Sequence, residues 1–150
     1  LHTNDAPGAV SRLLDMGAEP FMLAASLNLC QAQRLVRRVC SRCKKPVKVP
    51  QTFLEKHADE LPDDIGDEPR TYQGDGCKHC GGSGYKGRTA VVEMMPVTPE
   101  LQEMIAEGAS LAEIRKKARQ QGMVTLMENG IRKAFEGVTS LEEVLRVTST

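Results

Sequence analysis

The sequence contains no tryptophan, and its 150 residues include only two tyrosines and three phenylalanines. A hydrophobic core must therefore be built from leucine, valine, isoleucine, methionine and alanine. The sequence also lacks an apolar run of about 20 residues, the length that spans a bilayer, and it has no secretory signal at its start. These absences predict a soluble chain that contacts a membrane only through a partner.

The chain has no formal net charge, since 20 lysines and arginines balance 20 aspartates and glutamates. Without excess positive charge or aromatic residues for base stacking, the composition argues against nucleic-acid binding. The charges are nevertheless separated: seven basic residues and no acid lie over 34–48, whereas seven acids and one lysine lie over 55–68. Two interpretations remain open, namely solvated surface segments or patches that meet across a subunit boundary or a partner contact.

Local patterns predict a chain that is helical at both ends and irregular in the middle. Apolar periodicity and helix-capping residues give the elements at the start of the chain. We expect helices over 6–16 and 20–27, a strand over 29–39, a weaker helix over 50–59 and a strand over 88–97. Between the two strands the chain is rich in proline, glycine, aspartate and cysteine, so we expect a unit held together by something other than apolar burial.

From Thr98 onward four amphipathic helices are predicted. Three of them begin with a capping box, in which a serine or threonine precedes a glutamate by three residues. The pairs are Ser110/Glu113, Thr125/Glu128 and Ser140/Glu143, and glycines at 108, 122 and 137 mark helix ends. Each helix can bury its apolar face against the others.

Four of the five cysteines form two C-x-x-C pairs, Cys40/Cys43 and Cys77/Cys80. Each pair places two thiolates on one side of a tight turn, and two such turns supply the four sulfur ligands of a tetrahedral Zn²⁺. Closing the loop between the pairs costs on the order of 3 kcal/mol before its residues are ordered. A structural zinc contributes roughly 10–16 kcal/mol, which predicts a closed, structural zinc site without catalytic water.

Other uses of the cysteines remain as alternatives. A redox pair would need a thioredoxin-like surrounding, and disulfides would need an oxidising compartment. His79 could replace one cysteine ligand, but its place between Cys77 and Cys80 predicts that it points outward. Cys30, within the predicted strand, is expected to be a small buried residue.

The glycines after Cys80 could suggest a phosphate-binding loop, but the sequence contains no G-x-x-x-x-G-K-[ST] motif. We expect these glycines to let backbone N–H groups approach the sulfurs and to adopt positive φ angles. They are Gly81, Gly82, Gly84 and Gly87.

Two family resemblances meet at this cysteine-rich stretch. CKHCGGSG, from Cys77, is similar to the repeat of the cysteine-rich domain in J-type co-chaperones, but the stretch from Cys40 lacks its glycines. A second resemblance extends over the whole chain, to the secretion ATPases that drive type IV pilus assembly and type II secretion. It rests, in order, on LHTNDAPGAVSRLLDMG, AQRLVRRVCSRCK, GCKHCGGSGYKGRTAVVEMMPV and GVTSLEEVLRVT.

The second resemblance implies the C-terminal part of a cytoplasmic, hexameric ring ATPase, with an α+β fold. Residues 1–39 would be the C-terminal piece of a RecA-like α/β motor domain, 40–97 a tetracysteine zinc-binding subdomain and 98–150 a small all-α helical subdomain. His2 would be the remnant of a His box that lies near the nucleotide γ-phosphate. The start at Leu1, without methionine and directly ahead of a helix, is expected of a piece of a larger protein.

The Walker A loop, the Walker B acid and the N-terminal arginines of this family are not found in these residues. Phosphoryl transfer needs a phosphate cradle, magnesium and a positioned water, so we expect ATP and Mg²⁺ to bind only in the full-length parent. No catalytic residue is therefore assigned here. The implied partners are neighbouring subunits and the inner-membrane platform protein of the pilus or secretion machine. The alternatives are the same region of a type II secretion ATPase and a freestanding zinc-ribbon module that binds nucleic acid or unfolded chains.

Overall fold

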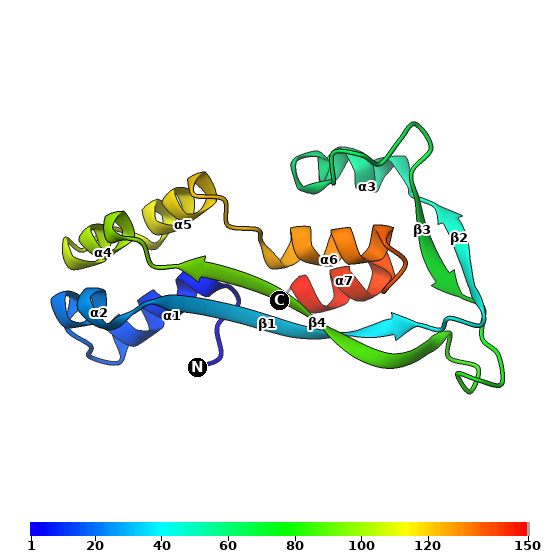
Figure 1. Cartoon of the computed structure of the whole chain (residues 1–150), viewed down its shortest axis with the longest axis horizontal. Helices are drawn as coiled ribbons and strands as arrows, with labels where there is room; N and C mark the ends of the chain where they lie inside the picture. Colours follow the sequence, from blue (N-terminus) through cyan, green and yellow to red (C-terminus); the bar gives the residue numbers. More distant parts are fainter. Residues whose placement is uncertain (150) are drawn as a thin grey trace. The chain divides into compact units, whose positions relative to one another are not determined.

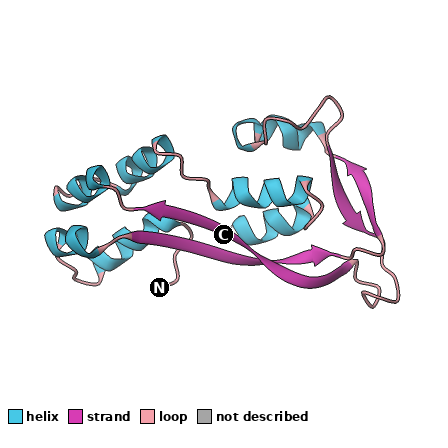
Figure 2. Cartoon of the chain, in the orientation of Figure 1, coloured by secondary structure: helices cyan, strands magenta, loops and turns pink. Residues whose placement is uncertain are grey.

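The computed structural model describes residues 1–149 and forms two compact units (Figure 1). Unit 1 consists of Leu1–Gln33 and Val92–Thr125, and unit 2 consists of Arg34–Val91 and the chain from Leu126 onward. The strands β1 (Leu29–Val39) and β4 (Tyr85–Pro96) pair with each other and run through both units (Figure 2). Each unit therefore combines two stretches that are far apart in the sequence.

Unit 1 packs helices from the beginning and the middle of the chain. The helix α2 packs against α4, and α1 packs against α5. Their apolar side chains form a core in which Val10, Leu101 and Ile105 are almost fully buried. Short helices gain most of their stability from such burial rather than from propensity. The helices are α1 (Ala6–Asp15), α2 (Pro20–Ser26), α4 (Pro99–Ala106) and α5 (Leu111–Gln120).

Polar contacts fix the start of α1 within unit 1. The Asp5 carboxylate caps the helix by accepting the N–H of Gly8 at 2.9 Å, and it also accepts from Nε of Arg115 at 2.6 Å. The buried Glu93 of β4 accepts the N–H of Ala6 at 2.8 Å. These bonds satisfy helix N-terminal donors and link α1 to α5 and β4.

Unit 2 combines a second, antiparallel strand pair with helices. The strand β2 (Lys44–Lys48) pairs with β3 (Arg70–Gly74) in a register that places Lys44 opposite Gly74 and Lys48 opposite Arg70. Its core consists of Val49, Phe53, Ile131, Ala134 and Val144. The helices are α3 (Gln51–Lys56), α6 (Leu126–Phe135) and α7 (Leu141–Thr148), with a short 3-10 helix η1 (Ala58–Glu60).

Most predicted elements agree with the structure. The strand over 29–39 is confirmed without change, and the first two helices end within one residue of their predicted ends. The predicted helix over 50–59 is divided into α3 and η1, and the predicted strand over 88–97 begins earlier, at Tyr85. The strands β2 and β3 were not predicted, because the segment KKPVK contains one apolar residue and a proline.

The helices after residue 98 are divided between the units, with α4 and α5 in unit 1 and α6 and α7 in unit 2. This differs from the expectation of one all-α group whose members all pack on one another. The reason is that β4 brings α4 and α5 beside α1 and α2, whereas the apolar faces of α6 and α7 join the core around Val49. No helix within residues 1–149 has the length and apolar character needed to cross a membrane.

The contact of α6 with α7 depends on the absence of a side chain at Gly130. A methyl group added there would lie 2.6 Å from Cγ1 of Val144, well inside van der Waals contact. We predict that Gly130→Ala destabilises unit 2 by about 1–3 kcal/mol through overpacking, although alanine favours helix by up to about 1 kcal/mol over glycine. Urea unfolding measures the change.

A Val144→Ala background provides the control for this prediction. Removing the valine methyl groups makes room at Gly130. Adding Gly130→Ala to that background should therefore leave the free energy of unfolding unchanged or increase it. An equal loss in both backgrounds would contradict the assigned contact.

Candidate metal centre

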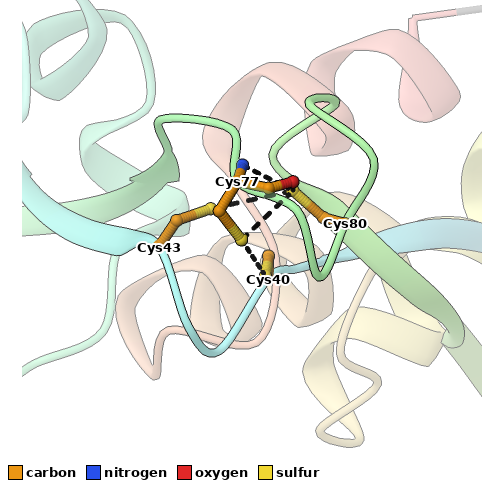
Figure 3. Close-up of side chains that lie close together, drawn as sticks. All are labelled: Cys40, Cys43, Cys77 and Cys80. Atoms are coloured by element: carbon orange, nitrogen blue, oxygen red, sulfur yellow. Dashed lines mark hydrogen bonds between the residues drawn. The ribbon is translucent and has the colours of Figure 1, made fainter.

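The four predicted ligands come from the turns that join the strands of unit 2. Cys40 directly follows β1, and Cys43 directly precedes β2. Cys77 and Cys80 lie in the turn between β3 and β4. Figure 3 shows the four side chains pointing toward one another, with their sulfur atoms all within 4.8 Å. The structure therefore brings together the four cysteines named from the sequence.

The sulfur separations fit a tetrahedral metal ion. The Sγ atoms of Cys40 and Cys77 lie 3.8 Å apart, those of Cys43 and Cys80 3.9 Å, and those of Cys77 and Cys80 3.8 Å. With Zn–S bonds of about 2.3 Å, the sulfurs of a regular tetrahedron are about 3.8 Å apart. A disulfide would instead bring two sulfurs to about 2.05 Å. The geometry matches a four-sulfur site for a soft metal such as Zn²⁺.

Backbone N–H groups point at two of the sulfurs. Sγ of Cys80 accepts from the N–H of Cys77 and of Gly84, both at 3.2 Å, and Sγ of Cys43 accepts from Gly76 at 3.3 Å. Such bonds stabilise thiolate charge and orient metal ligands. Of the four glycines named from the sequence, Gly84 donates its N–H to a sulfur, so the expectation that these glycines let N–H groups reach the sulfurs is confirmed at that position.

The same environment sets the acidity of the thiols. Burial favours the neutral form, but the N–H donors outweigh it at Cys80 and lower its pKa to about 6. At Cys43, burial and the neighbouring thiols raise the pKa to about 12. Four thiolates this close repel one another, so a cation between them is what allows all four to be deprotonated.

Glycines allow the two turns to approach each other. A side chain at Gly84 would place its Cβ 2.5 Å from the carbonyl oxygen of Gly74, and one at Gly76 would place it 2.6 Å from that of Gly82. Gly76, Gly82 and Gly84 also have φ angles of 97°, 86° and 81°, a region that favours glycine. The glycine-rich stretch therefore shapes the cysteine cluster.

The other residues considered as site residues lie outside the cluster. Within the described chain, the group that could hold a metal contains four cysteines and does not include His79. Cys30 is buried in β1, as predicted, and burial raises the pKa of its thiol. His2 is exposed ahead of α1.

A buried carboxylate that bonds to β1 was not recognised from the sequence. Glu143 at the start of α7 has 1% of its side chain exposed, and its Oε1 accepts from Nη2 of Arg37 at 2.7 Å. Its Oε2 accepts the backbone N–H of Arg37 at 2.7 Å, and Arg146 donates to both oxygens. Glu143 therefore joins α7 to β1, three residues before Cys40.

This finding corrects the predicted capping box at Ser140. The Ser140 hydroxyl does accept the N–H of Glu143 at 3.2 Å, as an N-cap should, but the Glu143 side chain bonds to arginines instead of completing the box. The full capping box is confirmed at Ser110, where Glu113 bonds back to the cap N–H. The box proposed at Thr125 stays a prediction.

The loop before α7 also bonds to both long strands. Thr139 Oγ1 donates to the carbonyl of Arg37 at 2.7 Å, and the Val39 N–H donates to Val138 at 3.0 Å. The hydroxyls of Tyr85 and Ser140 lie 2.7 Å apart, and the Arg37 guanidinium lies 4.2 Å from the centre of the Tyr85 ring. These contacts give the segment GVTSLEEV a structural role at the strand ends next to the cysteines.

Substitution of any one of the four clustered cysteines by serine should abolish stoichiometric metal binding. The expected result for Cys77→Ser is loss of bound zinc and unfolding of the 40–84 region, because zinc binding and folding are coupled. Elemental analysis and hydrogen exchange measure the two effects. Cys30→Ala is the matched control, and it should retain one zinc per chain; equal metal loss in this control would show that the cluster is not the site.

Glu143→Gln should destabilise the protein at neutral pH by about 1–3 kcal/mol, because the buried side chain loses the charge that pairs with Arg37 and Arg146, whose guanidinium groups are partly screened by solvent. The neighbouring, exposed Glu142 provides the control, and Glu142→Gln should change stability by less than about 0.5 kcal/mol. Urea unfolding of the two variants gives the difference, and similar effects would contradict the role of Glu143.

The loss caused by Glu143→Gln should also depend on pH. Burial would raise the pKa of Glu143, but the hydrogen bonds from Arg146 and Arg37 outweigh it and lower that pKa to about 2. The ionised group therefore stabilises the folded state fully above its unfolded pKa of about 4.3, and this stabilisation disappears as pH falls toward 2. The difference in free energy of unfolding between Glu143→Gln and Glu142→Gln should therefore shrink as the pH falls over that range. Both variants keep the four cysteines, so loss of metal in acid affects them alike.

Comparison with known proteins supports the whole-chain resemblance. The family model described as "Type II/IV secretion system protein" matches residues 1–146. The chain is 48% identical over 149 residues to the type IV pilus assembly ATPase PilB of Myxococcus xanthus and 47% identical over 148 residues to that of Thermus thermophilus. It is 45% identical over 151 residues to a putative type II secretion system protein E of Escherichia coli.

Each of these alignments covers 99% of the chain but only 26%, 16% and 29%, respectively, of the relative. The chain therefore spans about a quarter or less of most of these proteins. The match over nearly all residues outweighs the eight-residue similarity to co-chaperone repeats. The chain belongs to the type II/IV secretion system protein family.

Proposed function

We propose that the chain is the C-terminal part of a cytoplasmic, hexameric ATPase that powers type IV pilus assembly, and in particular pilus extension. The observation that carries this proposal is the similarity, over 99% of the chain, to proteins named type IV pilus assembly ATPases. Because the chain spans about a quarter of such relatives, ATP hydrolysis is proposed for the full-length protein and not for these residues alone.

The three parts of the chain would have different tasks in that protein. Residues 1–39 would complete a RecA-like motor domain, with His2 near the γ-phosphate of bound ATP. Residues 40–97 would form the zinc-binding subdomain. Residues 98–150 would form the helical subdomain, whose helices α4 and α5 lie in unit 1 and whose helices α6 and α7 lie in unit 2. The parent would supply the phosphate loop and the ligands for Mg²⁺, which in phosphoryl transfer neutralises the charge that develops on the phosphates.

The metal centre would have a structural role in the motor. Cys40, Cys43, Cys77 and Cys80 would hold Zn²⁺, and a site with four cysteine ligands has no open position for a reacting water. The Glu143 contacts connect α7 to the strand that leads to this centre. A fixed connection between α7, β1 and the metal centre would suit a protein that transmits force to its partners.

The partners we propose are neighbouring subunits of the hexamer and the inner-membrane platform protein of the pilus machine. Membrane association would be peripheral and indirect, through the platform protein, with no insertion and no nucleic-acid partner. A freestanding zinc-ribbon module would instead bind nucleic acid or unfolded chains, and a salt-dependent gel shift would favour it.

The second candidate is the same region of a type II secretion ATPase, because one relative at 45% identity carries that description. Expression of the full-length protein in strains that lack one or the other ATPase separates the two candidates. Restored pili support the first candidate, and restored secretion supports the second.

ATP turnover tests the division of labour between this chain and its parent. We predict that the purified full-length protein hydrolyses ATP and that residues 1–150 alone do not, since their sequence contains no phosphate-loop motif. A phosphate-release assay measures both. Turnover by residues 1–150 would contradict the assignment, and no turnover by the full-length protein would contradict the motor function.

A further inference from the structure

Unit 2 carries two charged patches of opposite sign. A cavity of about 240 Å³ near the cysteine turns is lined by Arg38, Ser41, Lys44 and Lys86 and by one acid, Glu136. We call it the basic hollow. The acidic loop is the segment 62–68, which connects η1 to β3 and contains the carboxylates of Asp63, Asp64, Asp67 and Glu68.

The key charges of both patches lack partners within residues 1–149. Arg38 and Lys86 are exposed, and neither makes an ion pair or a side-chain hydrogen bond there; the same is true of Asp63, Asp64 and Asp67. Elsewhere in unit 2 such pairs do form, for example Lys45 with Asp75 at 2.5 Å. Asp64 lines a second cavity with Arg70 and Arg132 but forms no ion pair with either of them. Within the described residues, Arg38, Lys86, Asp63 and Asp67 are therefore charges without an ion-pair partner.

The ammonium group of Lys44 in the basic hollow makes two contacts within unit 2. Its Nζ donates to the carbonyl oxygen of Gly137 at 3.3 Å and lies 5.3 Å from the centre of the Tyr72 ring. A positive charge that is already positioned loses less side-chain entropy when an acidic group docks beside it.

Within one chain the two patches lie toward opposite ends of β2, although Glu136 lines both the basic hollow and the cavity that contains Asp64. Lys44, at the hollow, and Lys48, opposite Arg70 at the end of the acidic loop, lie at opposite ends of β2. Four residue steps of extended strand correspond to about 13 Å, which exceeds the Debye length of about 8 Å at physiological salt. Figure 1 shows the loop between η1 and β3 at one end of the strand pair and the cysteine turns at the other.

We propose that the acidic loop of one copy of this chain docks into the basic hollow of a second copy. The two patches differ, so this contact is head-to-tail, and repeating it builds a ring or an open filament rather than a two-fold dimer. The inference rests on the proposed function in one respect, that several copies of the chain meet within one assembly. Complementary charge of this kind sets the orientation and specificity of the contact.

Charge reversal in the full-length protein tests the inference. The hollow variant carries Arg38→Glu and Lys86→Glu, and the loop variant carries Asp63→Lys and Asp64→Lys. Each variant alone places like charges at the contact, so sedimentation velocity should show association weakened by roughly tenfold or more. A one-to-one mixture should recover association, because each reversed patch then meets its complement, and high salt should weaken the recovered assembly.

Glu103→Lys with Glu107→Lys is the matched control, since it reverses two exposed acids of unit 1. It should leave association unchanged. The inference is overturned if either patch variant associates normally, if the mixture does not recover, or if the control weakens association as much. Zinc content measured on every variant confirms that the unit is folded.

ATP turnover measured on the same samples separates this inference from the proposed function. Turnover without any dependence of association on the two patches would overturn the inference and leave the motor function standing. Charge-dependent association without turnover would overturn the motor function and leave the inference standing.

Discussion

Four cysteine sulfurs must meet at one point, and the backbone of unit 2 is arranged around that requirement. The first turn joins β1 to β2, and the second joins β3 to β4, so one metal ion would fix the ends of all four strands. The close approach of Gly74 to Gly84 leaves no room for side chains between the turns. A polar segment with few apolar residues can be ordered in this way because metal binding supplies the folding energy that burial does not.

The buried Glu143 extends this constraint to the helices. It accepts the backbone N–H and the guanidinium of Arg37, and so holds α7 against the strand that ends at Cys40. A buried carboxylate is costly unless it is fully hydrogen-bonded, and here two arginines and a backbone donor meet that need. The interaction therefore positions the metal centre relative to the core around Val144, within one unit.

The sequence predicted features that depend on nearby residues and missed those that depend on distant ones. The spacing of two C-x-x-C pairs identified the ligands, and β-branched residues identified β1, because both signals are local. Glu143 looked like a capping residue, since its true partner Arg37 is 106 positions away in the sequence. β2 has mostly polar, exposed residues, so its pairing with β3 leaves no periodic pattern to read.

X-ray absorption at the zinc edge of the purified protein is the most direct test of the central claim. The account predicts four sulfur neighbours at about 2.3 Å and no nitrogen or oxygen ligand. A nitrogen in the first shell would indicate that a histidine such as His79 replaces a cysteine, and an oxygen would indicate an open position for water. Either result, or a protein that folds fully without metal, would contradict a closed structural site.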